Sequence, residues 1–216
     1  MARMARVIAP GYPHHVVQRG NRRQSTFFCH DDYRFYFDLL VEAKHSAGIE
    51  VWAYCFMPNH VHFVVVPEHA DSLRLFFSEA HRRYTRRINT RNNWRGHLWQ
   101  ERFHSFVMDQ NHLDCAVRYV ELNPLRSKLC TAAEGWHWSS AGAHLLGRDN
   151  GLVSVEPMLA RFSDWRTYLA ESPTKREIDS LRKHTRTGRP SPDDGFVEII
   201  EALVGRSLRK KKPGRK

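Results

Sequence analysis

A tight turn followed by an apolar strand is encoded in Met57-Pro58-Asn59-His60-Val61-His62-Phe63-Val64-Val65-Val66. Pro58-Asn59 marks the turn, and the β-branched and aromatic residues after it favour extended backbone. Side chains at i and i+2 of a strand point to the same face, so His60 and His62 can place both imidazoles beside one ion. A chance His-x-His stays open as the alternative, because the chain has 14 histidines. The segment predicts the second arm of a β-hairpin that begins with two paired imidazoles.

The pattern on either side predicts the order strand, helix, strand, strand, helix, strand. The expected strands are 14–20, 50–56, 60–66 and 103–108, and the expected helices are 31–47 and 73–89. The helices carry apolar residues at helical spacing, whereas the strands are rich in aromatic and β-branched residues. This order is that of a split βαβ, or ferredoxin-like, antiparallel sheet with helices on one face. We therefore expect an α+β fold, followed by a helical, basic C-terminal extension.

One further helix, expected at 111–123, carries a tyrosine that matters below. Pro124 cannot sit in a helix interior and disfavours helical geometry for the residue before it, so the helix should end at Asn123. Side chains at i and i+4 are neighbours on a helix, which places Tyr119 and Asn123 together along the border of its apolar stripe. Both can face a common point beside the sheet.

Glycines at 147 and 151 suggest a boundary between two domains. We expect a catalytic domain over residues 1–148 and a smaller helical extension with a basic tail over 149–216. The helices expected in the extension are 165–170, 177–183 and 196–204, with a linker at 188–192. The basic end of the chain has no acidic residue and is expected to be disordered unless it binds something acidic.

Positive charge dominates the chain, with 34 Lys and Arg against 23 Asp and Glu and a formal net charge of +11. Such an excess attracts polyanions, and arginine suits bidentate contacts to phosphate and guanine, so nucleic acid is the expected partner. The alternative for a charge run is a solvated face, and for the tryptophans a hydrophobic corner beneath a loop. The candidate DNA contacts are Arg19, Arg22, Arg23, Arg82, Arg83, Arg86, Arg87, Trp94, Arg95, Trp99, Arg102 and Arg118.

Several classes of protein are disfavoured. The longest apolar runs, near 51–56 and 61–66, fall far short of the roughly 20 residues that a membrane helix needs. The N-terminus lacks an apolar signal core, so we expect a cytoplasmic protein associated with the nucleoid, and no membrane partner. The four cysteines include no Cys-x-x-Cys pair, which argues against a zinc ribbon and a disulfide framework.

Taken together, these motifs resemble those of the HUH single-strand tyrosine transposases, and in particular the REP-associated tyrosine transposases. The resemblance covers most of the chain. The motifs that carry it are Gly11-Tyr12-Pro13-His14-His15-Val16-Val17-Gln18-Arg19-Gly20-Asn21, Met57-Pro58-Asn59-His60-Val61-His62, Leu98-Trp99-Gln100-Glu101-Arg102-Phe103, Arg118-Tyr119-Val120-Glu121-Leu122-Asn123-Pro124-Leu125-Arg126 and Trp138-Ser139-Ser140.

The resemblance implies a site made from four side chains. His60 and His62 would hold a divalent metal, Tyr119 would attack DNA, and Asn123 would be the third metal ligand. The mobile-element relatives typically carry glutamine at this last position, so asparagine keeps the amide oxygen on a shorter side chain. Imidazole ligands suit zinc or manganese, whereas phosphate oxygens and an amide suit magnesium, and we expect Mg²⁺ or Mn²⁺. Two alternatives stay open, a core role for the tyrosine and a helix-terminal role for the asparagine.

The activity that the resemblance implies is nicking and rejoining of single-stranded DNA at REP-type hairpins through a 5′-phosphotyrosine. Arg118 and the loop arginines would favour the phenolate form of Tyr119. A monomer acting in cis is expected, with a dimer not excluded. The alternatives are a catalytically idle protein that binds REP hairpins, and a hydrolase that uses the histidines with water and leaves Tyr119 dispensable.

Overall fold

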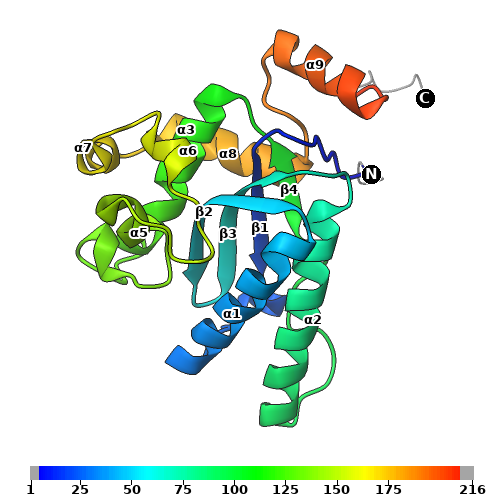
Figure 1. Ribbon diagram of the computed structural model, residues 1–216. Coiled ribbons are helices and arrows are strands. Elements are labelled where there is room, and N and C mark those ends of the chain that lie inside the picture. The colour runs from blue at the N-terminus through cyan, green and yellow to red at the C-terminus, as the bar shows by residue number, and fades with distance from the viewer. Residues whose placement is uncertain (1–4, 210–216) are drawn as a thin grey trace.

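A four-stranded antiparallel sheet forms the centre of the computed structural model, which describes residues 5–209 (Figure 1). Its strands are β1 (His14–Arg19), β2 (Ile49–Met57), β3 (His60–Pro67) and β4 (His104–Val107), in the order β2-β3-β1-β4. Helix α1 (His30–Ser46) connects β1 to β2, and α2 (Ser72–Asn92) connects β3 to β4. This arrangement confirms the predicted α+β, ferredoxin-like fold.

Further helices follow the sheet in the described part of the chain. They are α3 (Gln110–Glu121), α4 (Asn123–Arg126), α5 (Ala141–Leu146), α6 (Glu156–Leu159), α7 (Trp165–Ala170), α8 (Lys175–Thr187) and α9 (Asp194–Val204). Short 3-10 turns lie at Asn21–Arg23 and Ala133–Gly135. Within residues 5–209 no helix has the length and apolar content needed to cross a membrane.

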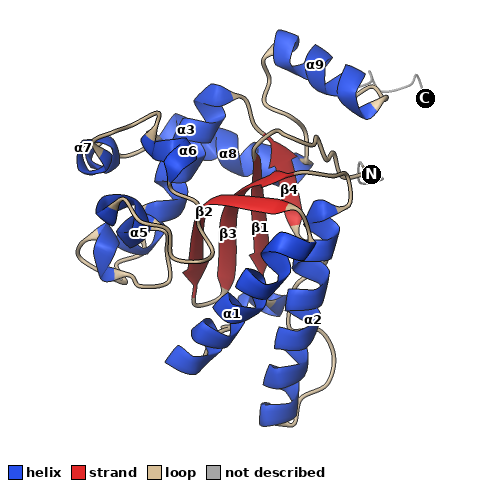
Figure 2. Ribbon diagram, in the orientation of Figure 1, coloured by secondary structure: helices blue, strands red, loops and turns tan. Residues whose placement is uncertain are grey.

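Both faces of the sheet are buried, which explains why the sequences of β2 and β3 are almost continuously apolar. The helices of the split βαβ unit, α1 and α2, cover one face (Figure 2). On this face, Phe56 and Phe63 pack in one core cluster with aromatic side chains of the two helices. The opposite face, which includes Cys55 and Val64, is covered by α3, while α8 lies against β4 and β1. The expected extension thus packs directly onto the sheet through α8.

Strand register decides which polar side chains share the α3 face of the sheet. Val17 of β1 lies opposite His62 of β3, and Arg19 lies opposite His60. Because paired residues and every second residue along a strand point to the same side, His15 also lies on this face. The face that meets α3 therefore carries four histidines in the described strands, namely His15, His60, His62 and His104, which pairs with Val17. Of these, only His60 and His62 were expected to act.

The tyrosine-bearing helix ends earlier than predicted. Asp109 caps α3 by accepting a hydrogen bond from the backbone N–H of His112, and the helix ends at Glu121. Asn123 then begins α4, and Pro124 lies in the first turn of α4, where the N–H that proline lacks is not needed. A second short helix therefore starts where the proline was expected to stop the first.

The expected helices of the extension are present. The predicted segments 165–170, 177–183 and 196–204 correspond to α7, α8 and α9, and α8 starts earlier because Thr174 and Glu177 form a capping box. After α9, the Arg206 guanidinium donates to the carbonyl oxygens of Ala5 and Arg6, which joins the two ends of the described chain. Most of the predicted basic tail, residues 210–216, lies outside the described residues.

Candidate active site

A pocket of about 820 Å³ lies on the α3 face of the sheet and collects the residues that the sequence singled out. His60 and His62 enter it from β3, Tyr119 from α3 and Asn123 from the first turn of α4. Side chains of α8, among them Thr185, line it as well. Three separate regions of the sequence therefore meet at one place.

The two histidines from β3 stand close together, with ring centroids 4.8 Å apart and ring planes inclined by 78°. Nδ1 of His60 lies 2.6 Å from Oδ1 of Asn59, whose Nδ2 donates to the carbonyl oxygen of Arg23. The amide orientation of Asn59 is fixed by that second bond, so His60 donates from Nδ1 and keeps Nε2 available. Nδ1 of His62 lies 3.2 Å from Nε2 of His15.

Burial keeps both histidines neutral. It lowers the pKa of His60 to about 4, with a further lowering by the charge of Arg19. Burial lowers the pKa of His62 well below the ordinary value, helped by its neighbours His60 and His15 and by nearby arginines. Neutral imidazole is the form that binds a metal ion, so both rings are ready as ligands at neutral pH.

Tyr119 and Asn123 face the same space. The ring centroid of Tyr119 lies 5.5 Å from that of His62, and Tyr119 is 7% exposed. The guanidinium carbon of Arg126 lies 4.8 Å from the centroid of the tyrosine ring. Asn123 is 4% exposed, and its Nδ2 is buried without a hydrogen-bond partner in the described chain. A buried amide without a partner is costly unless something else binds it.

These side chains fit a divalent cation. Nε2 of His62 is also buried without a partner, so a ring nitrogen that can bind a cation stands unsatisfied in the pocket. The unpartnered Nδ2 of Asn123 is a donor, and only Oδ1 of the same amide could bind a metal ion. In the described range no three His, Cys, Asp or Glu side chains gather into a metal site. A cation here would therefore have two imidazoles and an amide from the protein, and oxygen atoms of water or phosphate would complete its shell.

Arginines make the pocket strongly positive. The arginines that line it are Arg19, Arg23, Arg126, Arg182 and Arg186. Of these, Arg182 lies 3.9 Å from Asp179, and the other four form no ion pair with any residue of the described chain. Arg19 and Arg23 were predicted to bind DNA, whereas Arg126, Arg182 and Arg186 were missed. The signal for Arg126 was present, because it closes the motif that contains the tyrosine.

Arg118 does not lie in the pocket, although it precedes the tyrosine. Its Nη1 donates to the carboxylate of Glu171 at 2.9 Å, and its guanidinium carbon lies 4.7 Å above the centroid of the Tyr168 ring. Successive residues on a helix differ by about 100 degrees in direction, so neighbours in sequence face different surroundings. The cation beside Tyr119 is Arg126, not Arg118 as the sequence suggested.

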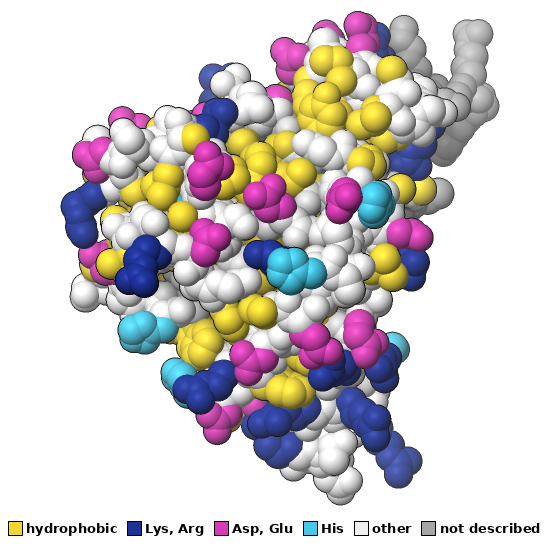
Figure 3. All heavy atoms as spheres, viewed as in Figure 1, with side chains coloured by type: hydrophobic (Ala, Val, Ile, Leu, Met, Phe, Trp, Pro, Cys, Tyr) yellow, Lys and Arg dark blue, Asp and Glu magenta, His cyan; other side chains and the backbone are white. Residues whose placement is uncertain are grey.

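The arginines of α2 form a separate basic surface. Arg82 pairs with Glu79 and Arg83 with Glu42, whereas the guanidinium of Arg87 lies over the ring of Phe35. These three and Arg86 line one shallow hollow of the helix, and Lys and Arg side chains gather over this end of the molecule in Figure 3. Arg22 is exposed in the 3-10 turn Asn21–Arg23, and Arg95 is exposed in a loop. None of these residues lines the pocket of Tyr119.

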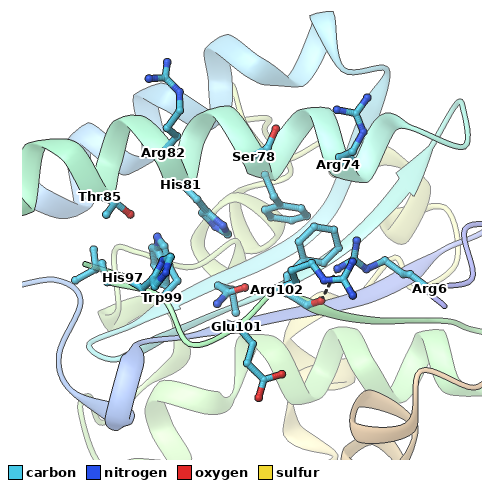
Figure 4. A pocket seen from close by; sticks show the side chains of 14 residues that line it. Arg6, Arg74, Ser78, His81, Arg82, Thr85, His97, Trp99, Glu101 and Arg102 are labelled. Atoms are coloured by element: carbon cyan, nitrogen blue, oxygen red, sulfur yellow. Dashed lines mark hydrogen bonds between the residues drawn. The ribbon is translucent and has the colours of Figure 1, made fainter. Parts of the chain in front are cut away.

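Trp99 lies in the core instead of on the surface. It is 7% exposed and packs against Tyr36 and Tyr84, so the hydrophobic-corner alternative describes it correctly. It also borders a second pocket, of about 490 Å³, with exposed Arg102 at its rim (Figure 4). Trp94 is 44% exposed, edge-on to Phe28, and is available for stacking.

A buried carboxylate, Glu121, anchors the end of the tyrosine helix. It is fully buried and accepts hydrogen bonds from Nδ1 of His144 at 2.7 Å and from Nε1 of Trp165 at 2.8 Å. The hydroxyl of Ser140 donates to the same carboxylate. This network explains the glutamate at position 121, two residues after Tyr119, and the serine at position 140. The sequence analysis quoted both motifs but assigned no role to these side chains.

Comparisons with known proteins identify the family and support the fold. The family described as "Transposase IS200 like" matches residues 10–123, more than half of the chain. A solved REP-associated tyrosine transposase, bound to a REP hairpin, is 21% identical, and the match covers 72% of this chain and 90% of that chain with a TM-score of 0.53.

A second solved structure, of a candidate transposase from Deinococcus radiodurans R1, is 18% identical over 63% of this chain and 98% of that chain, with a TM-score of 0.38. No curated protein matches the chain. The first of the two solved structures supports the fold, and the family match extends from the start of β1 through the tyrosine helix to Asn123. The chain belongs to the family of IS200-like transposases.

Proposed function

We propose that this transposase is a metal-dependent enzyme that nicks and rejoins single-stranded DNA at REP-type hairpins, with Tyr119 as the nucleophile. One observation carries the proposal, namely that Tyr119, His60, His62 and Asn123 meet in a pocket lined by arginines. A core tyrosine would have no need of two neutral imidazoles and an unpartnered amide beside its ring.

The reaction follows from what these side chains can do. Bound by His60, His62 and Asn123, Mg²⁺ or Mn²⁺ would withdraw charge from the scissile phosphate. The phenolic oxygen of Tyr119 attacks phosphorus and forms the O–P bond of a 5′-phosphotyrosine, while the P–O3′ bond breaks. The tyrosine proton is lost to solvent or a nearby base, and the 3′ oxygen leaves as a hydroxyl. The bond energy is retained, so the reverse step rejoins a strand.

Arginines supply the rest of the electrostatics. Arg126, beside the Tyr119 ring, would favour the phenolate, which is otherwise a minor form because the ordinary pKa of tyrosine is about 10. Arg19 and Arg23 at the pocket rim would hold the phosphates on either side of the cleaved bond. The basic surface of α2 lies outside this pocket and suits the duplex stem of a hairpin. A DNA substrate of this kind makes the nucleoid the proposed place of action.

The relative solved with a REP hairpin supports a hairpin of this type as the substrate. All four side chains of one chain converge on the same pocket, which supports Tyr119 acting in cis. Residues 1–148 would supply these groups, and the extension 149–216 would close one side of the pocket through α8.

A covalent conjugate tests the proposal. The protein is incubated with labelled single-stranded oligonucleotides that carry candidate hairpins, in Mn²⁺ or Mg²⁺, and a denaturing gel is inspected for DNA bound to protein. We expect a conjugate that requires the metal and disappears in Tyr119→Phe, His60→Ala and His62→Ala. Tyr12→Phe is the matched control, because Tyr12 lies against Phe196, away from the pocket.

Two outcomes would overturn the proposal. Retained hairpin binding without any conjugate would identify a catalytically idle DNA-binding protein. Cleaved DNA that is never attached to protein, with full activity in Tyr119→Phe, would identify a hydrolase that uses the histidines and water.

A further inference from the structure

His15 is a third buried imidazole beside the pocket, and the reaction above gives it no role. It is 1% exposed, and its Nε2 lies 3.2 Å from Nδ1 of His62, with the two ring planes within 6° of parallel. On its other side, Nδ1 of His15 lies 3.2 Å from the hydroxyl oxygen of Thr185 in α8. A chain of polar contacts therefore links the C-terminal extension to a proposed metal ligand.

The direction of each hydrogen bond in this chain can be assigned. The hydroxyl of Thr185 donates to the carbonyl oxygen of Leu181 at 2.8 Å. A hydroxyl has a single hydrogen, so the oxygen of Thr185 can only accept from His15, and Nδ1 of His15 must carry a hydrogen. The ring of His15 is buried and forms no ion pair with an acidic residue of the described chain, so it carries this one N–H and no second one. Its Nε2 is then an acceptor.

The tautomer of His62 follows from that of His15. Because Nε2 of His15 accepts, Nδ1 of His62 must donate, and the lone pair of Nε2 remains. That Nε2 is the buried nitrogen without a partner in the described chain. Asn59 achieves the same for His60 by accepting from its Nδ1. Both histidines thus present Nε2, by two unrelated devices.

We propose that His15 and Thr185 are positioning residues that fix the Nδ1–H tautomer of His62, so that its Nε2 is set in advance to bind a divalent cation. The inference that Nε2 binds a cation rests on the proposed function, whereas the assignment of the tautomer does not. Partners that orient a metal-binding histidine through its second nitrogen are a general requirement of such sites. Here the partner chain ends on α8, which makes the extension part of the site.

Nitrogen-15 NMR of the imidazole rings in the metal-free, full-length protein tests the tautomer directly. We expect His62 and His15 to be protonated at Nδ1 and bare at Nε2. In Thr185→Val, which keeps the shape but removes the acceptor, His62 becomes a mixture of tautomers, and Thr185→Ser restores the single form. His60 serves as internal reference, because Asn59 holds it independently.

The matched control is Thr187→Val on the same helix. The Thr187 hydroxyl also bonds to a helix carbonyl, that of Lys183 at 3.0 Å, but Thr187 does not line the pocket. This variant is expected to leave the His62 signals unchanged. A wild-type His62 protonated at Nε2, or a His62 tautomer that is unaffected in both Thr185→Val and His15→Phe, would overturn the proposal.

Metal affinity gives a second readout, with Mn²⁺ alone as the probe in calorimetric titrations. His15→Phe is expected to weaken Mn²⁺ binding about 10- to 100-fold. Thr185→Val weakens it in the same direction by less, and Thr185→Ser restores it. Thr185→Val lies on a partly exposed helix face, so it keeps the test valid if His15→Phe does not fold. Wild-type affinity in folded samples of both variants would contradict a positioning role.

The two proposals fail separately. The tautomer measurement needs neither DNA nor metal. The expected spectra together with an absent Tyr119 conjugate would therefore overturn the proposed function and support the positioning role of His15 and Thr185. If Thr185→Val and His15→Phe form the conjugate with wild-type yield and leave the His62 spectra unchanged, the positioning role is overturned and the proposed function is supported.

Discussion

At the scale of single residues, His14 stays neutral because burial disfavours the charged form of its ring. Burial is the larger effect and lowers the pKa of His14 to about 4. The hydrogen bond to the Tyr12 carbonyl acts in the opposite direction and raises that pKa by less. Nδ1 of His14 donates to that carbonyl at 2.8 Å, and Nε2 accepts from the backbone N–H of Ala9 at 3.2 Å. A protonated ring could not accept this second bond, so a proton would disrupt the fold locally.

We predict that the free energy of unfolding falls as pH is lowered from about 6.5 to about 4. In the unfolded chain a histidine binds a proton near pH 6.5, whereas folded His14 stays neutral down to about 4. The unfolded state therefore holds more protons in this window, and the stabilisation, complete above pH 6.5, is lost on acidification. Each such group contributes about 1.4 kcal/mol per pH unit. Urea denaturation at several pH values measures this, and equal stability at pH 7 and pH 5 would contradict it.

At the scale of elements, the position of Tyr119 depends on how the end of α3 is fixed. Glu121 binds three donors that come from segments 19 to 44 residues later in the chain. These contacts hold α3 against α5 and α7 and leave the preceding turn, with Tyr119, turned toward the sheet. The network is buried, so each of its members must be paired.

We predict that Glu121→Gln lowers the free energy of unfolding by about 3 kcal/mol, because the buried donors lose a charged acceptor. The matched control is Glu171→Gln, whose carboxylate is 73% exposed in its pair with Arg118 and is expected to change stability by less than about 1 kcal/mol. Chemical denaturation of the two variants compares them. Similar small losses in both would show that the buried network is not an anchor.

The elements themselves could largely be predicted from periodicity, because each depends on neighbours in sequence. The strands and the helices α1, α2 and α7 begin and end within three residues of expectation. Pro124 was read as a stop signal but lies in the first turn of α4, since a proline that ends one helix can equally begin the next. Sequence pattern does not distinguish these two uses.

At the scale of the whole molecule, positive charge is divided between two places with different character. The pocket arginines include Arg19, Arg126 and Arg186 without acidic partners in the described chain, whereas Arg82 and Arg83 on α2 are paired with glutamates. Unpaired guanidinium groups can bind phosphate without first losing a salt bridge. The pocket should therefore contribute more to DNA affinity than the net charge alone indicates.

We predict that Arg126→Gln reduces the dependence of single-strand binding on salt by about 0.7 in the slope of log affinity against log salt, the value for one phosphate contact. Arg118→Gln should leave the slope unchanged, because Arg118 is engaged by Glu171. Fluorescence anisotropy of a labelled hairpin oligonucleotide, between about 50 and 200 mM salt, gives both slopes. Equal slopes for the two variants would argue against a phosphate contact by Arg126.

Contacts between side chains that are far apart in the sequence could not be predicted from the sequence. His60 and His62 could be paired from the sequence because they share a strand face. The ligand role of Asn123 came from the family resemblance, and the structure places this residue in α4 instead of on the helix of Tyr119. His15 and Thr185 are 170 residues apart, and Arg118 meets an acid 53 residues later. No local periodicity encodes such pairs, since they depend on how the helices of the extension are placed on the finished sheet.

The pocket is bordered by β1 and by α8, which lie far apart in the described chain and are therefore synthesised at different times. A nascent chain that ends after the tyrosine helix contains His15, yet it lacks Thr185, the residue that orients His15 and through it the imidazole at position 62. If His15 and Thr185 act as proposed, the centre of the growing polypeptide is completed only after Thr185 has been translated and α8 has packed on the sheet.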